Sequence, residues 1–283
     1  MPNNKGRVTR LEVVEKQWLT PHLVRLVFAG PGGAPLADFP MPEFTDTYVK
    51  LAFPRPGADY AEPYDLEEVR ATRPPEQWPV LRAYTIRWFD DDAGRLAIDL
   101  VVHGDEGIAG PWAAGAEVGD PVQALGPGGA YAPDPEADAH LLVGDEAALP
   151  AIAAALDRLP VGARADVFVE VADGAEELTL TTSADVRLRW VHRACSALPP
   201  GEELAATVRA ADLPDGDVHA FVHGDAGFVR ELRSYLRFDR GMPRERLSIS
   251  GYWRRGSSDE EWRARKRDWN AAVEAEETQR TSA

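Results

Sequence analysis

The hydrophobic pattern of this chain changes its period near residue 133, and this change constrains the fold more than any single motif does. Before it, short runs of alternating apolar and polar residues are separated by turns rich in Gly, Pro and Asp. These runs cover residues 7–15, 23–29, 48–53, 83–89, 95–102 and 121–125. Alternation with turn residues between the runs predicts an antiparallel β barrel.

After a polar connector with two prolines at residues 130–138, apolar segments alternate with helical stretches. The apolar segments cover residues 140–143, 165–171, 186–191, 218–222 and 247–250. Strands separated by helices are typical of a parallel sheet with crossovers. We therefore expect a β-barrel domain over residues 1–133 and an α/β domain over residues 134–283.

Three further stretches carry local predictions. Residues 54–79 are rich in Pro, Glu, Asp and Tyr without a clear period, so we expect a surface excursion with a short helix at residues 65–71. The tail from Glu274 is acidic, and we expect it to be disordered. One helical face after Asp225 is predicted to be core and consists of Phe228, Val229, Leu232, Tyr235 and Leu236.

The composition excludes several kinds of protein. A net charge of −16 argues against nucleic acid or anionic lipid as a partner. No apolar run approaches the ~20 residues that span a bilayer. The start, Met1–Arg7, lacks the apolar segment of a secretory signal, so we expect a cytoplasmic protein without stable membrane association. Cys195 is the only cysteine and the six histidines lack ligand spacing, so we expect no protein-held metal.

The run Arg82–Arg87 combines a cation, an aromatic ring and a hydroxyl on one predicted strand. Arg82 and Tyr84 would share one face and Thr85 would turn away from it. Such a set suits a flavin nucleotide, because a guanidinium binds phosphate, an aromatic ring lies against a flat heterocycle and a hydroxyl meets a ring nitrogen. The alternative is an ordinary barrel strand with its aromatic side chain in the core.

A second segment follows about twenty residues later, where an alternating strand ends in glycines and an alanine-rich helix begins at about Ala109. Free N–H groups at a helix start favour an anion such as a pyrophosphate. The alternative is a common glycine-rich turn. The candidate cofactor contacts in this segment are Val102, His103, Gly107, Ile108, Ala109, Gly110, Trp112 and Ala113.

With these two segments and several other motifs, the chain resembles the siderophore-interacting, FAD-binding family of ferric-siderophore reductases, a branch of the ferredoxin-NADP reductase-like flavoproteins. The other motifs are Thr20–Arg25, Thr45–Leu51, Val143–Ala151, Trp190–Arg193 and Gly251–Arg254. Two positions depart from the family pattern. Ile108 stands where a proline is usual, and Val222–Asp225 replaces a more typical Ala-Gly-Glu version.

The resemblance implies FAD in the barrel domain and NADPH or NADH in the α/β domain. No Gly-x-Gly-x-x-Gly motif follows the first α/β strand. Gly144, Asp145 and Glu146 stand at its carboxyl end instead, where open α/β sheets bind ligands, although the two acids could equally cap the next helix. Glu170 and Asp173 would disfavour a 2′-phosphate and Arg193 would favour one, so the choice of nicotinamide cofactor stays open.

The block after the last predicted strand contains two aromatic residues and a dense basic cluster. The resemblance places Tyr252 and Trp253 beside the flavin ring. We predict that Arg254, Arg255 and Lys266 bind substrate, the alternative being a solvated helix face balanced by Glu. A capping box at Ser257 or Ser258 predicts the start of a helix whose packing stripe is Trp262, Trp269 and Val273.

The sequence thus predicts a ferric-siderophore reductase in which electrons pass from NAD(P)H through FAD to chelated Fe(III). Because the flavin carries the chemistry, no catalytic side chain is expected. A ferredoxin donor is possible but less favoured. Two alternatives stay open, namely a flavin reductase with another acceptor and a siderophore-binding protein without enzymatic activity.

Overall fold

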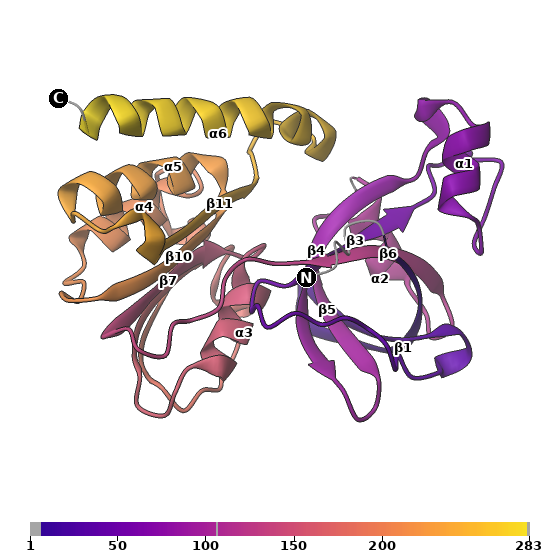
Figure 1. Ribbon diagram of the computed structural model, residues 1–283, viewed down its shortest axis with the longest axis horizontal. Helices are drawn as coiled ribbons and strands as arrows, with labels where there is room; N and C mark the ends of the chain where they lie inside the picture. The colour runs from indigo at the N-terminus through magenta and orange to yellow at the C-terminus, as the bar shows by residue number, and fades with distance from the viewer. Residues whose placement is uncertain (1–6, 106, 282–283) are drawn as a thin grey trace. The chain divides into compact units, whose positions relative to one another are not determined.

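The computed structural model describes residues 7–105 and 107–281 (Figure 1). The chain divides into two compact units, Met1–Ala132 and Pro133–Ala283, which are described separately below. Glu106, inside the segment predicted to bind pyrophosphate, lies outside the described residues, as does most of the start on which the prediction about secretion rests. Across the described residues, no helix has both the length and the apolar character needed to cross a bilayer.

The first unit is a closed antiparallel barrel with the strand order β1-β2-β5-β4-β3-β6. The strands are β1 (Val8–Thr20), β2 (Leu23–Ala29), β3 (Tyr48–Phe53), β4 (Val80–Asp90), β5 (Arg95–Val101) and β6 (Pro121–Gly128). The inward side chains of the alternating runs, among them Phe28, Leu51 and Ile98, form one buried cluster. Alternation puts every second residue on the core side, which is why the predicted runs recur as strands.

Residues 54–79 form the predicted excursion from the barrel, with the short helix α1 (Leu66–Thr72) and the 3₁₀ turn η3 (Pro75–Gln77). Asp65 caps α1 by accepting the N–H groups of Glu67 and Glu68 at 2.8 and 3.0 Å. The helix is not merely solvated, because Leu66 and Val69 pack into a small apolar cluster on barrel strands β3 and β6. A turn at η2 (Pro31–Gly33) follows β2.

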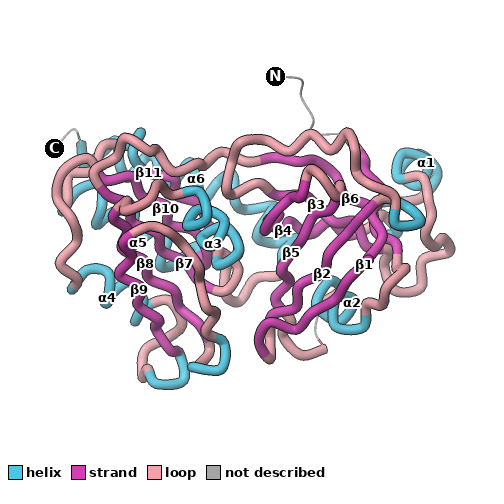
Figure 2. Tube along the Cα trace, turned by 90° about the horizontal axis from the view of Figure 1, so that it is seen from below, coloured by secondary structure: helices cyan, strands magenta, loops and turns pink. Residues whose placement is uncertain are grey.

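The second unit contains a five-stranded parallel sheet in the order β11-β10-β7-β8-β9, seen strand by strand in Figure 2. The strands are β7 (Ala139–Asp145), β8 (Arg164–Val171), β9 (Asp185–His192), β10 (Val218–Asp225) and β11 (Leu247–Trp253). Counted along the unit, this is the 3-2-1-4-5 order of doubly wound dinucleotide-binding sheets. The expected fold class, a ferredoxin-NADP reductase-like pair of barrel and α/β units, is confirmed.

Helices flank both faces of this sheet, with α3 on one and α4, α5 and α6 on the other (Figure 1). They are α3 (Leu149–Arg158), α4 (Glu202–Ala210), α5 (Ala226–Ser234) and α6 (Asp259–Thr281), with short turns at η4 (Gly174–Glu176), η5 (Arg193–Cys195), η6 (Tyr235–Asp239) and η7 (Arg244–Arg246). The predicted core face of α5 and η6 is confirmed, with Tyr235 half-buried and the rest buried.

The expectation of a disordered tail from Glu274 is wrong, because α6 continues to Thr281. Glu276 and Glu277 form ion pairs with Arg230 and Arg233 of α5. The acidic composition of the tail therefore matches a basic face of the neighbouring helix. Composition alone predicts disorder for this tail, because composition contains no information about binding partners that are distant in sequence.

Candidate functional site

Strand β4 presents the first group of predicted site residues. Its register with β3 pairs Arg82 with Leu51 and Tyr84 with Val49 across the ladder. Since Leu51 and Val49 belong to the barrel core cluster, Arg82 and Tyr84 share their face and Thr85 takes the other. Arg82 and Tyr84 are half-buried, and Tyr84 packs partly against the core. Thr85 is buried. Tyr84 therefore lies on the strand face predicted to bind the ligand, and it also packs partly against the core, as the alternative of an ordinary barrel strand expected.

The loop after β5 leads into the second group of predicted residues. Gly104 and Gly107 have φ angles of +53° and +81°, which L side chains rarely adopt, and a Cβ on either would meet no heavy atom within 4 Å. The helix α2 (Ala109–Gly115) then starts at Ile108, which offers no side-chain hydrogen bond to its first turn. The backbone is therefore accessible at these two glycines, and the N–H groups that begin α2 have no side-chain acceptor from their cap.

The other end of α2 is held by a residue that sequence reasoning missed. Lys16 of β1 donates to the carbonyl oxygens of Ala114 and Ala116 at 2.6 and 3.0 Å. A cation at the carboxyl end of a helix satisfies orphan carbonyls and complements the helix dipole. Trp112 packs against Phe53 with ring centroids 5.2 Å apart. These contacts fix the direction in which the start of α2 points.

The Thr45–Leu51 motif has a structural role at the start of β3. The buried Asp46 carboxylate accepts the N–H groups of Ala130 and Tyr131 at 2.8 and 2.9 Å. Burial raises the pKa of Asp46 above its usual value, against the effect of these hydrogen bonds. The motif therefore ties β3 to the chain after β6, close to the end of the barrel unit.

The third group of candidate residues lies at the carboxyl end of β7, beside β10. These are the first and fourth strands of the 3-2-1-4-5 order, and their junction is the topological switch point at which such sheets bind ligands. The side chain of Asp145 is only 3% exposed and lies buried at this junction. Its Oδ2 accepts the backbone N–H of Asp225 at 2.9 Å and Nε1–H of Trp253 at 2.8 Å. Burial raises the pKa of Asp145 to about 7, and the Glu146 carboxylate adds to the rise.

Two glycines let the strand ends approach this closely. A Cβ on Gly144 would lie 2.5 Å from Ala148 Cβ and 2.9 Å from the carbonyl oxygen of His223. A Cβ on Gly224, whose φ is +141°, would lie 2.5 Å from Asp145 Oδ2. Gly144 is therefore required for packing at this junction, whatever ligand binds above it.

Neither Asp145 nor Glu146 is the N-cap of the next helix, although Asp145 Oδ1 accepts the Ala147 N–H at 3.0 Å in the turn before it. The cap of α3 is Ala148, without a side-chain hydrogen bond. Glu146 instead forms a two-pronged ion pair with Arg193, in which Nη1 lies 2.8 Å from Oε2 and Nη2 contacts Oε1. Arg193 Nη1 also lies 3.6 Å from Glu170 Oε1. Arg193 and Glu170, two of the residues that left the choice of nicotinamide cofactor open, thus form one ionic group with Glu146.

The C-terminal block divides into buried and accessible parts. Tyr252 meets the buried His223 edge-on, with ring centroids 4.9 Å apart and planes at 87°. His223 Nε2 lies 3.0 Å from Ser248 Oγ, and burial lowers the pKa of His223 to about 3, so this imidazole is neutral. Trp253 is 38% exposed although its indole N–H is held by Asp145.

The three predicted substrate-binding cations do not lie in one place. Arg254 and Arg255 are exposed and line a cavity of about 450 Å³, together with Gly201 at the start of α4 and Gly227 at the start of α5. Lys266 is half-buried on α6 and donates to Ser250 Oγ at 3.2 Å, and burial lowers its pKa.

The predicted cap and packing stripe of α6 are confirmed. The Ser258 N–H donates to Glu261 at 2.9 Å, and the Glu261 N–H donates to Ser258 Oγ at 3.2 Å, a reciprocal capping box. Trp262 and Val273 are buried, and Trp262 packs edge-on against Trp269.

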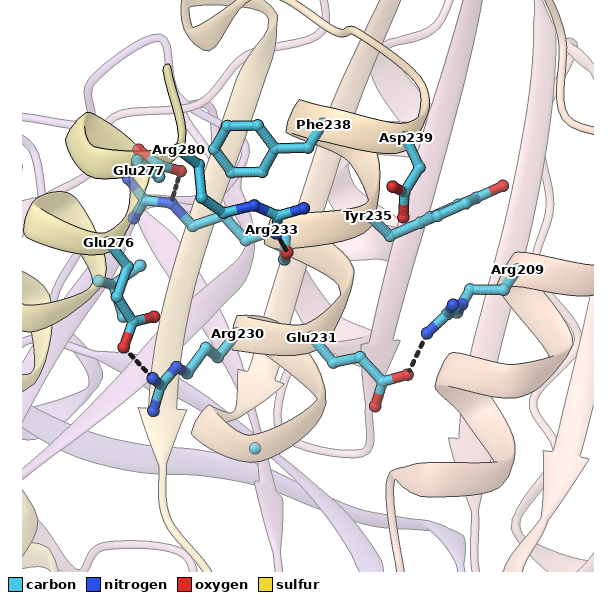
Figure 3. Close-up of a pocket in the computed structure, with 13 residues that line it drawn as sticks. Arg209, Arg230, Glu231, Arg233, Tyr235, Phe238, Asp239, Glu276, Glu277 and Arg280 are labelled. Carbon is cyan, nitrogen blue, oxygen red and sulfur yellow. Dashed lines mark hydrogen bonds and ion pairs between the residues drawn. The ribbon is translucent and has the colours of Figure 1, made fainter. Parts of the chain in front are cut away.

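A second cavity of about 360 Å³ lies between α5, η6 and α6 (Figure 3). Three of its four arginines contact acidic groups of the same wall, and the fourth, Arg280, contacts Ser234 Oγ and the Phe238 ring. Arg233 holds Glu277 through two hydrogen bonds of 2.6 and 2.8 Å, and Arg209 holds Glu231 at 3.1 Å. Because these charges cancel locally, the cavity offers little attraction to an ionic ligand.

The two units have the ferredoxin reductase-like fold, and comparisons with known proteins agree. Residues 12–131 match the sequence model of the siderophore-interacting FAD-binding domain, and residues 137–256 match that of the siderophore-interacting protein. The chain belongs to the siderophore-interacting protein family, which confirms the resemblance described above.

Relatives extend over nearly the whole chain. An uncharacterized protein of Mycobacterium tuberculosis is 44% identical over 270 residues, 91% of this chain and 94% of the relative. The ferric vibriobactin reductase ViuB of Vibrio cholerae is 31% identical over 255 residues, 88% of this chain and 90% of the relative. The siderophore-interacting protein SipS from Aeromonas hydrophila has a similar crystal structure, with a TM-score of 0.76, 30% identity, and coverage of 93% of this chain and 98% of SipS.

A more distant structure shows the fold alone. The ferredoxin reductase in carbazole 1,9a-dioxygenase matches with a TM-score of 0.63 at 16% identity, over 87% of this chain and 70% of that chain. Its likeness covers both units, which supports the assignment of the barrel and the sheet to the ferredoxin reductase-like fold.

Proposed function

We propose that the protein is an FAD-dependent ferric-siderophore reductase that takes its electrons from a nicotinamide dinucleotide. The observation that carries this proposal is the match of both units to siderophore-interacting family models, together with a full-length relative named ferric vibriobactin reductase. The proposed place of action is the cytoplasm, where reduced nicotinamide nucleotides are supplied.

The barrel unit has the donors that FAD requires. Arg82 can bind a phosphate oxygen through its planar fork, Thr85 can hydrogen-bond the ring system, and Tyr84 can lie against it. The accessible glycine backbone before α2, with its uncapped helix start, fits a diphosphate. Bound there, FAD would supply the redox chemistry that links a two-electron donor to a one-electron acceptor.

In the second unit we assign the nicotinamide nucleotide to the switch point between β7 and β10. Asp145 fixes Trp253 and the Asp225 backbone there, so these groups are in place before a ligand arrives. Tyr252 and Trp253 form the aromatic surface that we propose beside the flavin ring. The chain's own part is to bind, orient and shield, so we assign no side chain as nucleophile or general acid.

The ferric siderophore is the substrate, and Arg254 and Arg255 are the cations we propose to attract it. Siderophores hold Fe(III) through hard oxygen donors, which bind Fe(II) much more weakly, so reduction releases the metal. The carboxylates of Glu202, Asp225 and Glu231 line the same cavity, so the proposed attraction comes from the two exposed guanidinium groups themselves and not from the cavity as a whole.

The test is oxidation of NADH or NADPH by the FAD-loaded protein, with an Fe(II)-specific chelator present to trap the product. We expect nucleotide oxidation that depends on added ferric triscatecholate or trishydroxamate complex, with Fe(II) appearing in step. Oxidation driven equally well by free flavin or a quinone, without Fe(II), would instead assign a flavin reductase. Binding of the ferric complex without any nucleotide oxidation would assign a binding protein.

A further inference from the structure

The end of the second strand of a 3-2-1-4-5 sheet determines which nicotinamide nucleotide fits. In such sheets a carboxylate there accepts the ribose 2′-hydroxyl of NAD, whereas an arginine nearby accommodates the 2′-phosphate of NADP. In this unit the second strand is β8, and its end carries Glu170. Arg193 begins the turn η5 after the neighbouring strand β9. The sequence therefore contains both the residue that would reject the phosphate and the one that would accept it.

The structure shows that Arg193 is already engaged. Both terminal nitrogens of its guanidinium contact the two oxygens of Glu146, and Nη1 is also 3.6 Å from Glu170. The planar fork that would hold a phosphate therefore holds a carboxylate. The side chains of Arg193 and Glu146 are only 26% and 16% exposed, so water screens their attraction poorly.

The neighbouring carboxylate cannot move away to make room. Both oxygens of Glu170 accept the N–H of Gly201, at 3.0 and 2.9 Å, and this places the carboxylate at the start of α4. Glu170 is 3% exposed. A phosphate that approached Arg193 would therefore meet Glu170 at the same nitrogen.

The rest of this sheet edge adds negative charge. Asp173 follows β8 and caps η4 by accepting the Ala175 N–H at 2.8 Å. His192, at the end of β9, is 2.7 Å from Glu177. At this edge Arg193 contacts Glu146 and Glu170, and His192 contacts Glu177. Asp173 adds a fourth carboxylate. A 2′-phosphate carries up to about two negative charges, whereas a ribose hydroxyl carries none.

From this geometry we propose that the protein uses NADH in preference to NADPH, and that the Glu146–Arg193 ion pair sets this preference. The inference rests on the proposed function, which requires a nicotinamide donor but does not choose between the two. Glu146 acts as a specificity residue by occupying the guanidinium that would otherwise bind the extra phosphate.

The experiment measures kcat/KM for NADH and for NADPH with the FAD-loaded protein and a ferric trishydroxamate acceptor. We expect NADH to be favoured by at least about tenfold. Glu146→Gln keeps the side-chain shape but removes the charge and frees Arg193, so the ratio of kcat/KM for NADPH to kcat/KM for NADH should rise by about tenfold. Glu276→Gln is the matched control, since it also frees an arginine, Arg230, from an ion pair, on α5. It should leave the ratio unchanged.

A binding measurement provides a readout without turnover. Equilibrium dialysis of NAD⁺ and NADP⁺ against the wild type should show tighter binding of NAD⁺, and this holds even if Glu146→Gln does not fold. Equal or tighter NADP⁺ binding, or an unchanged ratio in a folded Glu146→Gln protein, would overturn the inference and leave the reductase assignment standing. If neither nucleotide binds or is oxidised, the proposed nicotinamide donor fails, and the inference fails with it.

Discussion

The loop before α2 and the junction of β7 with β10 both depend on glycine, but for opposite reasons. Around Gly104 and Gly107 the backbone turns through positive φ into open space. Around Gly144 and Gly224 an added Cβ would collide with neighbouring atoms at 2.5 Å. The first region leaves the backbone accessible to a ligand, whereas the second brings two strand ends and a buried carboxyl group together. We infer that the loop before α2 binds through its backbone, and the β7–β10 junction through side chains already held in place.

Glycine substitutions test this contrast and have the largest expected effect. Gly224→Ala combines a strained φ with a collision against Asp145, so we expect a loss of about 3 kcal/mol in unfolding free energy. Gly107→Ala has the strained φ but open space, so its cost should be about 1 kcal/mol. Urea unfolding followed by tryptophan fluorescence measures both. Equal losses would contradict the distinction between an open and a packed region.

Removing the guanidinium of β4 tests the ligand side of the comparison. Arg82→Ala should weaken FAD binding by roughly 1.5–3 kcal/mol, because it removes a charge-assisted contact to phosphate. Fluorescence titration of the apoprotein with FAD gives the dissociation constant. Arg95→Ala, an exposed arginine at the start of β5, is the control and should bind FAD as the wild type does. An unchanged constant in Arg82→Ala would remove Arg82 from the site.

The buried carboxyl group of the sheet unit gives a pH signature of its own. Burial raises the pKa of Asp145 from 3.8 to about 7. Between these values the folded state keeps a proton that the unfolded chain has released, so stability falls as the pH rises, by at most about 1.4 kcal/mol per pH unit. Asp145→Asn cannot titrate, so the advantage of the wild type over this variant should shrink between about pH 4 and pH 7. A constant difference across that range would contradict the assignment.

Charge reversal in the cavity at the end of β11 has a smaller and more selective effect. Arg254→Glu with Arg255→Glu should raise KM for a negatively charged ferric triscatecholate by about three- to tenfold and reduce its salt dependence. A cationic trishydroxamate should be little affected. Arg267→Glu is the control, because this side chain is 96% exposed on α6 and does not line the cavity. Equal losses with both substrates would assign the two arginines to structure or to the nicotinamide donor.

The smallest expected change in affinity comes from Thr85→Val. This substitution removes one hydroxyl and little surface, so FAD affinity should fall by less than about 1 kcal/mol. The flavin reduction potential should nevertheless shift, because the hydroxyl is proposed to bond the ring. Measuring both the FAD dissociation constant and the reduction potential separates a role of Thr85 in FAD affinity from a role in setting the flavin potential. A large affinity loss with an unmoved potential would assign Thr85 to anchoring.

Local pattern predicted the elements well, and contacts between distant residues were missed. The ends of β2 and β3 coincide with the predicted runs at 23–29 and 48–53, since alternation and flanking turns are encoded locally. Lys16 lies 98 residues from Ala114, whose carbonyl it holds, and no local signal links them.

The candidate site shows the same limit. The sequence placed Gly144, Asp145 and Glu146 at the end of a strand, and the structure has them there. It did not show that Glu146 faces Arg193, because which carboxylate meets which cation depends on how η5 returns to the sheet. For the same reason the acidic tail was read as disorder although its partners were present on α5.

The carboxylates of the last turns of α6 have a practical consequence for any shortened form of this chain. Glu274, Glu276 and Glu277 each neutralise an arginine, namely Arg244, Arg230 and Arg233 (Figure 3 shows the last two pairs). Trimming or proteolysis before Glu274 would leave these three arginines without their partners and turn a balanced surface into a basic one. Such a protein would bind phosphate, heparin or cation-exchange resin in a way that the full chain does not.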